Sequence, residues 1–262
     1  MPNRIYFFSG TGNSLCVAKA IVAVLPECEL MAVRHDTSPE MPAGYERIGF
    51  VFPDYAGGPP SMVADFIHDM QMPHQGSTYL FAVATYGGNA GSVIAQTATQ
   101  IRRRGLRLHY GATVLSFPNS IVTWLTLKLT RLFAGIAMRK TRHIIRDIVA
   151  KKQSPVPSLE QTAQKRYDAF MAPIHDTDYR YQVTDDCVSC RICEKICPGR
   201  NIAIEKGKPI FRHRCESCLA CIHHCPQGAI NYTSKGRRRW RYKHPDVSLA
   251  ELMQYSADEY VG

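Results

Sequence analysis

Two copies of one cysteine pattern constrain this chain more than any other feature of its sequence. Each copy reads CxxCxxCxxxCP, and the second begins 28 positions after the first, at residue 215 instead of 187. Each copy also places an isoleucine at the same offset, Ile202 in one and Ile230 in the other. The repetition indicates an internal duplication. The eight cysteines are Cys187, Cys190, Cys193 and Cys197, then Cys215, Cys218, Cys221 and Cys225.

Metal ligation explains these cysteines better than disulfide bonds do. The chain has 10 cysteines, an even count, but eight of them follow metal-ligand spacing and no export signal is visible at the N-terminus. Zinc also binds four thiolates and is the competing interpretation. The repeated order, with each run closed by Cys-Pro, favours two [4Fe-4S] clusters over zinc.

The spacing also predicts which cysteines share a cluster. Three cysteines spaced two residues apart can occupy three corners of a cubane, but the next cysteine of the same run cannot reach the fourth corner unless the chain reverses. In the two-cluster ferredoxin pattern, the fourth cysteine ligates the other cluster. We therefore expect two crossed sets of ligands. The first set is Cys187, Cys190, Cys193 and Cys225, and the second is Cys215, Cys218, Cys221 and Cys197.

The N-terminal half alternates strand-like and helical patterns, which is typical of βα units on a parallel sheet. We predict strands at residues 4–8, 29–33, 47–52, 79–84 and 108–115, and helices at 13–25, 60–70 and 92–104. These elements predict a doubly wound α/β fold with a five-stranded parallel sheet. The cysteine-rich segment then forms a second, smaller α+β domain, with a hairpin over residues 204–210.

The first predicted strand runs into a short polar, glycine-containing segment and then into a helix. Two glycines allow close approach of an anion, and the helix start offers free N–H groups. The segment lacks the lysine of GxxxxGK[ST], and Leu15 stands where GxGxxG needs glycine. The ligand that these exclusions leave is a monophosphate, bound through its terminal phosphate. The alternative is a simple capped turn that binds no ligand. The segment consists of Ser9, Gly10, Thr11, Gly12, Asn13 and Ser14.

The loops after the third and fourth predicted strands should complete the same site, because ligands of open α/β sheets lie beyond the carboxyl ends of the strands. Each loop pairs a tyrosine with glycines, which suits a flat heteroaromatic ring. The ligand that fits is FMN, although each tyrosine could equally be an ordinary loop aromatic. The candidate residues are Pro53, Asp54, Tyr55, Ala56 and Gly57, then Thr85, Tyr86, Gly87, Gly88 and Asn89.

Residues 1–118 resemble flavodoxin, whose phosphate loop reads Ser/Thr-x-Thr-Gly-x-Ser/Thr, as residues 9–14 do here. The resemblance implies that this loop binds the FMN phosphate and that Tyr55 and Tyr86 flank the isoalloxazine. The segment at 117–120 is similar to a Met-Pro-x-Asn-Tyr segment of flavodoxin domains fused to ferredoxins, which implies a flavin contact by Asn119. A turn after the strand explains that segment equally well.

Residues 183–232 resemble a bacterial two-cluster ferredoxin, and the tail resembles the end of flavodoxin and ferredoxin fusions called EFR-type. We expect a flavodoxin-like domain at 1–152 that includes an amphipathic helical extension, a helical connector at 153–181, a ferredoxin domain at 182–234 and a tail at 235–262. In the extension, an apolar stripe made of Val122, Leu125, Leu129, Leu132, Phe133 and Ile136 predicts a helix packed on the domain. A helix lying on a membrane surface is the alternative.

The remaining features bear on partners and location. The formal charge of +10 favours an acidic redox partner, unless the basic clusters are only solvated faces, and no nucleic-acid motif is present. The apolar stretch at 121–138 is interrupted by Lys128 and Arg131, so we expect no stable membrane insertion and a cytoplasmic protein. Cys16 and Cys28 fall outside the cluster spacing, and we expect both to be small buried residues.

A flavin beside iron-sulfur clusters would link one-electron to two-electron redox chemistry. The sequence therefore predicts electron transfer between two [4Fe-4S] clusters and FMN. A pure electron carrier is one alternative. A flavin-dependent reductase of a small-molecule acceptor is another, and it predicts a cavity beside Tyr55, Tyr86 and residues 119–135. A nucleic-acid binder with structural clusters is the third, and the sequence identifies no catalytic residue.

Overall fold

The computed structural model describes residues 1–41, 43–72, 76–120, 127–232 and 240–256. Its N-terminal part is built on five parallel strands in the order β2-β1-β3-β4-β5. This order is that of the flavodoxin-like doubly wound fold. All five predicted strands are confirmed to within two residues at each end. They are β1 (Asn3–Phe7), β2 (Cys28–Ala32), β3 (Arg47–Pro53), β4 (Tyr79–Tyr86) and β5 (Tyr110–Leu115).

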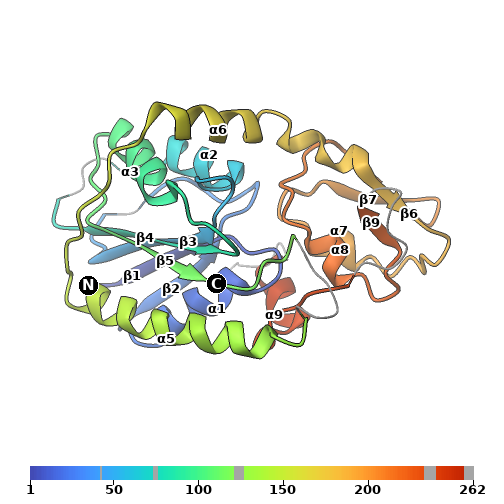
Figure 1. Cartoon of the computed structure of the whole chain (residues 1–262), viewed down its shortest axis with the longest axis horizontal. Helices are drawn as coiled ribbons and strands as arrows, with labels where there is room; N and C mark the ends of the chain where they lie inside the picture. Colours follow the sequence, from blue (N-terminus) through green and yellow to red (C-terminus); the bar gives the residue numbers. More distant parts are fainter. Residues whose placement is uncertain (42, 73–75, 121–126, 233–239, 257–262) are drawn as a thin grey trace.

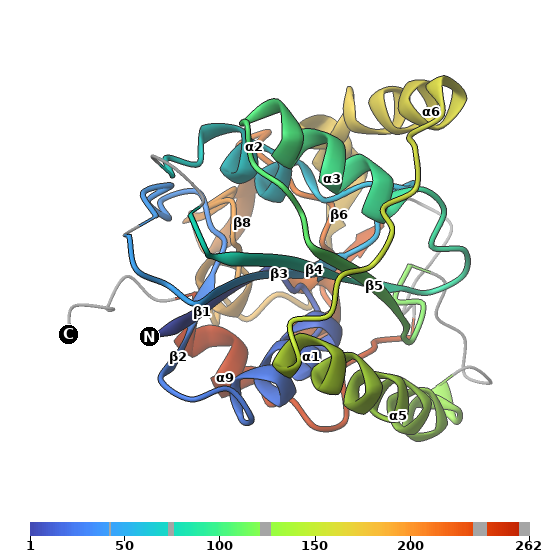
Figure 2. The same cartoon turned by 90° about the vertical axis from the view of Figure 1, so that its left-hand side faces the viewer.

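Helices cover both faces of the sheet (Figure 2). On one face lie α1 (Asn13–Val22) and α5 (Thr130–Val149), and on the other lie α2 (Ser61–Asp69) and α3 (Val93–Arg103). The two central strands β3 and β4 are buried along nearly their whole length, because both faces are covered. Two apolar cores result, one on each face of the sheet.

The predicted helical extension exists as α5, but its buried face is not the predicted one. Leu132 and Ile136 are 58% and 40% exposed, and Val122 and Leu125 lie outside the described residues. The packed face comes later in the helix and is carried by Ala137, Thr141, Ile144 and Ile148. The prediction of a helix packed on the domain is therefore confirmed, and Phe133 of the stripe contacts Phe117, but most of the buried side chains lie farther along the helix than the stripe indicated.

The connector α6 (Gln161–Met171) and a 3-10 helix (Ile174–Arg180) lead into the smaller domain. There β6 (Tyr181–Val183) pairs with β9 (Ile230–Tyr232), and β7 (Ile202–Glu205) forms the predicted hairpin with β8 (Lys208–Phe211). Helices α7 (Ile192–Lys195) and α8 (Ala220–His224) each lie within a cysteine run. A final helix, α9 (Leu249–Gln254), follows the smaller domain.

The duplication is visible in the backbone itself. Three pairs of positions 28 residues apart share the left-handed conformation, which side chains other than glycine rarely adopt. Their φ angles are 56° and 48° at Ser189 and Ser217, 61° and 60° at Arg191 and Leu219, and 47° and 63° at Arg200 and Gly228. The first two pairs lie between the cysteines of each run, where the chain must curl around a common centre.

The smaller domain lies beside the carboxyl ends of the parallel strands (Figure 1). Contacts from several loops hold it there, including an ion pair of 2.6 Å between Arg200 and Asp36 and a hydrogen bond from the His35 amide to the Pro198 carbonyl. The second domain therefore covers the edge of the sheet at which the candidate ligand loops emerge. Within the described residues, the helices are too short or too polar to cross a membrane.

Candidate functional site

The first expected set of cysteines lines one cavity of the smaller domain. Its members are Cys187, Cys190, Cys193 and Cys225. Burial raises the pKa of the Cys193 thiol to about 11, and the other three thiols raise it further. The set opens to the surface, since Cys190 is exposed and the neighbouring Val188 is 60% exposed.

The second expected set also comes together, with Cys215 and Cys221 buried and Cys197 and Cys218 half-buried. Its members are Cys197, Cys215, Cys218 and Cys221. Burial raises the pKa of the Cys218 and Cys221 thiols well above the usual value, and nearby thiols of the same set add to the effect. Four sulfurs this close and this desolvated are unfavourable as free thiolates. A bound cation or cluster would stabilise them.

Main-chain N–H groups donate to the sulfurs at equivalent places in the two copies. The amide of Asn201 lies 3.3 Å from the Cys197 Sγ, and the amide of Ala229 lies 3.3 Å from the Cys225 Sγ. The Ser217 amide donates to the Cys215 Sγ at 3.2 Å. Such bonds favour the thiolate form and tune the potential of a bound cluster.

Each set offers four cysteine sulfurs, a donor set that both iron-sulfur clusters and zinc use. Each set takes three sulfurs from one CxxCxxCxxxCP run and one from the other, which is the two-cluster pattern and favours iron-sulfur clusters. Within the described residues, ligand atoms of Cys16, His244 and Asp246 also come within 4.8 Å of one another.

The glycine-rich segment at residues 9–14 forms a tight loop at the start of α1. Gly12 is the N-cap residue, with φ of 101°, and it has no side chain to cap the helix. The N–H groups of the first turn are therefore left for another acceptor, as a phosphate would be. The Ser14 hydroxyl lies 2.8 Å from the Thr85 hydroxyl, so this loop and the loop after β4 are adjacent.

The two tyrosine loops also meet at this edge of the sheet. The Asp54 amide donates to the Thr85 carbonyl at 2.7 Å, and the Gly57 amide donates to the Asp54 carboxylate at 2.9 Å. Tyr55 packs edge-on against Phe170, which belongs to helix α6. Tyr86 is half-buried, whereas Gly87, Gly88 and Asn89 are exposed.

Asn119 lies at the phosphate loop, where its side-chain amide donates to the Thr11 hydroxyl at 3.1 Å. Sequence reasoning missed the two residues that help to hold this region. The His223 Nε2 donates to the Asn119 carbonyl at 2.9 Å, and its Nδ1 accepts from the Tyr242 amide. The Tyr242 hydroxyl donates to the Asn13 side-chain oxygen at 2.6 Å. The contacts of His223 with Asn119 and of Tyr242 with Asn13 join residues 104 and 229 positions apart, so no local pattern could reveal them.

The buried cysteine set lies directly against the phosphate loop. A Cβ atom on Gly10 would come within 2.2 Å of the Cys218 carbonyl oxygen, so the two backbones are in contact. Burial raises the pKa of Tyr55 well above its usual value, and the thiolates of Cys218 and Cys215 and the charge of Glu216 contribute. The second set therefore faces two of the loops expected to hold a flavin.

Glu216 fixes the contact between the domains. It is 6% exposed, and its carboxylate accepts from the Ser61 hydroxyl at 2.8 Å and from the Met62 amide at 3.1 Å. These donors belong to the first turn of α2. The cysteine loop of one domain thus caps a helix of the other, a favourable place for a carboxylate.

Asp54 should give this site a measurable pH dependence. Burial raises the pKa of its carboxyl to about 7. Because the folded state holds this proton more tightly than the unfolded chain, the contribution of Asp54 to stability falls as the pH rises from about 4 to 7. Asp54→Asn should therefore gain stability over the native chain across this range, by about 1–2 kcal/mol after allowance for partial exposure. Melting temperatures between pH 5 and 8 test this, with Asp69→Asn as an exposed control.

Comparisons with known proteins agree with a two-part chain. Residues 176–238 match the family described as 4Fe-4S dicluster domain. A flavoprotein in complex with FMN from Lactobacillus acidophilus is similar at 14% identity and TM-score 0.33, covering 43% of this chain and 92% of that one. Megasphaera elsdenii flavodoxin is similar at 20% identity and TM-score 0.36, covering 45% and 90%. No curated protein matches the sequence.

At these low values of identity and TM-score we base the fold of the N-terminal part on its strand order, which is that of flavodoxin. The cysteine-rich part is identified by its family match. The chain thus joins a flavodoxin-like α/β domain to a 4Fe-4S dicluster domain.

Proposed function

We propose that this protein transfers electrons between two [4Fe-4S] clusters, held by the crossed cysteine sets, and an FMN at the carboxyl edge of the sheet. One observation carries the proposal: the buried cysteine set is in backbone contact with the phosphate loop, at Cys218 and Gly10. When bound, the clusters supply one-electron chemistry and the flavin supplies one-electron or two-electron chemistry. This arrangement supports a converter between the two.

The different exposure of the two sets supports an order for the route. The first set reaches the surface at Cys190, whereas every member of the second set is buried or half-buried. We therefore propose that a partner protein exchanges electrons at the first set, and that the second set lies between it and the flavin. The formal charge of +10 favours an acidic partner.

The residues of the chain hold and shield the cofactors. The amides of Asn201, Ser217 and Ala229 stabilise the thiolates they donate to. The uncapped start of α1 supplies N–H groups to a phosphate without a cationic side chain in the loop. The Asp54 amide ties the two tyrosine loops together through Thr85, and its carboxylate holds its own loop through the Gly57 amide.

Anaerobic purification followed by quantification of iron, sulfide and flavin tests the proposal directly. We expect about eight iron atoms, about eight sulfides and one FMN per chain. Dithionite should reduce the clusters and the flavin, and a preparation with clusters but without FMN should regain flavin reduction on addition of FMN. A preparation with full iron that binds no flavin, or a flavin that dithionite-reduced clusters do not reduce, would contradict the proposal.

A further inference from the structure

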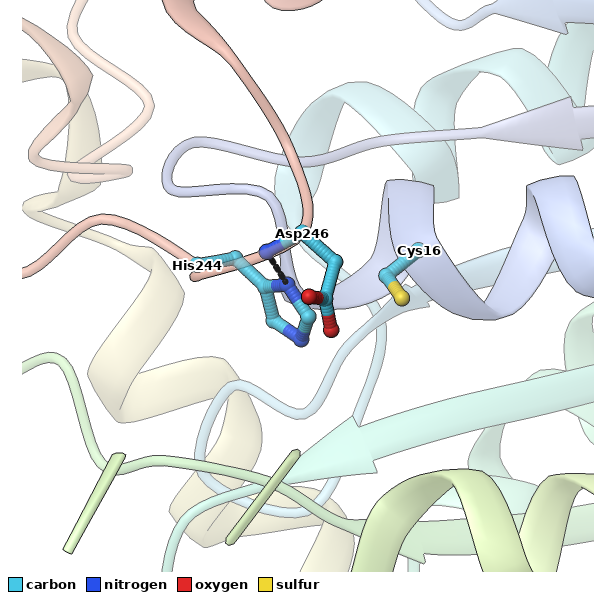
Figure 3. A group of neighbouring side chains, drawn as sticks. All are labelled: Cys16, His244 and Asp246. Atoms are coloured by element: carbon cyan, nitrogen blue, oxygen red, sulfur yellow. Dashed lines mark hydrogen bonds between the residues drawn. The ribbon is translucent and has the colours of Figure 1, made fainter. Parts of the chain in front are cut away.

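Three potential metal ligands converge beside the phosphate loop, near Gly12. They are Cys16 of α1, and His244 and Asp246 of the segment at residues 240–256, called the C-terminal segment here. One ligand atom of each residue lies within 4.8 Å of the others (Figure 3). Figure 3 shows the His244 imidazole, the Asp246 carboxylate and the Cys16 thiol next to one another. Cys16, which we expected to be buried, is partly exposed.

The protein backbone holds these residues in place by contacts that need no metal. The His244 amide donates to the Thr11 carbonyl at 3.0 Å. A Cβ atom on Gly12 would lie 2.8 Å from the His244 Cβ, so glycine at this position permits the close approach. Val247, the next residue after Asp246, is buried in the core beneath α1. These contacts therefore hold His244 and Asp246 next to α1 without a metal.

The donor types indicate which metal the group would take. One thiolate, one imidazole nitrogen and one carboxylate oxygen form a mixed set that suits zinc, whereas magnesium and calcium prefer oxygen ligands alone. We propose that Cys16, His244 and Asp246 bind one zinc ion, with water in the fourth position. Thiolate and carboxylate together neutralise the two positive charges of the ion.

Binding changes the protonation of two ligands. Burial, with a smaller contribution from the charge of Asp246, raises the pKa of Cys16 to about 11, so the thiol is neutral until zinc replaces its proton, which passes to solvent. Burial lowers the pKa of His244, which leaves its ring neutral and able to ligate. In the structure its Nδ1 accepts from the Asp246 amide at 3.2 Å. Ligation through Nε2 places the ring proton on Nδ1, so this long contact opens when zinc binds.

Zinc would fasten the C-terminal segment to the helix that begins at the phosphate loop. That segment also contacts the loop through Tyr242 and the smaller domain through Arg241, which donates to the Ile222 and Gly228 carbonyls. The metal would therefore stabilise the closed arrangement of the two domains, independently of electron transfer.

The test measures zinc and iron in the same sample of holoprotein. Protein with its full iron content is equilibrated with zinc at micromolar free concentration, desalted and analysed by elemental mass spectrometry. We expect one zinc per chain without loss of iron. Zinc K-edge absorption should show one sulfur at about 2.3 Å and lighter ligands near 2.0 Å, whereas zinc in a vacant cluster site shows four sulfurs.

Matched variants locate the site. Cys16→Ala and Asp246→Asn should each weaken zinc binding by more than about tenfold. Cys28→Ala is the control, because Cys28 is also partly buried and has a pKa of about 11. Asp246 is exposed and its amide contact is main-chain, so the asparagine variant should keep its iron and flavin. Absence of zinc from the native chain, four-sulfur coordination, or equal zinc in all variants would overturn the proposal.

Discussion

A chain carrying both Cys197→Ser and Cys218→Ser is expected to keep one intact cluster, with about four iron atoms instead of eight. Both cysteines lie in the buried set, although they come from different copies of the motif. If ligation is crossed, the two changes damage the same cluster, and the exposed set remains complete. Iron and sulfide analysis with electron paramagnetic resonance of the reduced protein measures the outcome.

The matched control pairs Cys197→Ser with Cys190→Ser. These two residues belong to one run of the sequence but to different sets in the structure, so the pair should damage both clusters and leave few iron atoms. Sequential ligation within each run predicts the reverse pattern for the two double variants. Loss of both clusters from the first variant together with retention of one in the control would therefore contradict crossed ligation.

Gly10→Ala should weaken flavin binding strongly, because Gly10 is buried between the two domains. The new Cβ would lie 2.2 Å from the Cys218 carbonyl oxygen, and both partners belong to backbone that packs between the two domains. One of the loops must move, which costs about 3 kcal/mol. We expect FMN affinity to fall by about 100-fold, measured by flavin fluorescence.

Gly135→Ala is a suitable control for this change. Gly135 lies in α5, where nothing stands within 4 Å of an added Cβ. Alanine is favoured over glycine in a helix, so this variant should bind FMN normally and gain up to about 1 kcal/mol of stability. Unchanged FMN affinity in Gly10→Ala would mean that the contact with Cys218 does not shape the phosphate loop.

The sequence predicted those features that depend on short spacing. The five strands, the hairpin at residues 204–210 and the helix at α5 all follow from local periodicity and turn residues. The grouping of Cys225 with the first run and Cys197 with the second was also accessible, because a three-residue spacing limits what each run can reach. The structure brings both groups together as expected.

Contacts between distant segments were not accessible from the sequence. Periodicity identified the apolar stripe near Leu132 but could not say which elements would cover it. In the structure Leu132 is exposed, and the buried side chains of α5 lie in its second half, from Ala137 to Ile148. The bonds from Tyr242 to Asn13 and from Glu216 to the start of α2 join residues separated by 229 and 154 positions. Such pairs depend on how the two domains dock, which no local pattern encodes.

The segment at residues 240–256 has a consequence for how the protein is made. It contacts the phosphate loop and the smaller domain, yet it leaves the ribosome after both of them. The smaller domain already contacts the N-terminal domain through Arg200 and Glu216, and the later segment adds the contacts of Tyr242 and Arg241 to that junction. Because domains generally fold as units in the order of their synthesis, the junction gains these further contacts only after both domains have left the ribosome. This order gives iron, sulfide and flavin an opportunity to enter before the junction is complete.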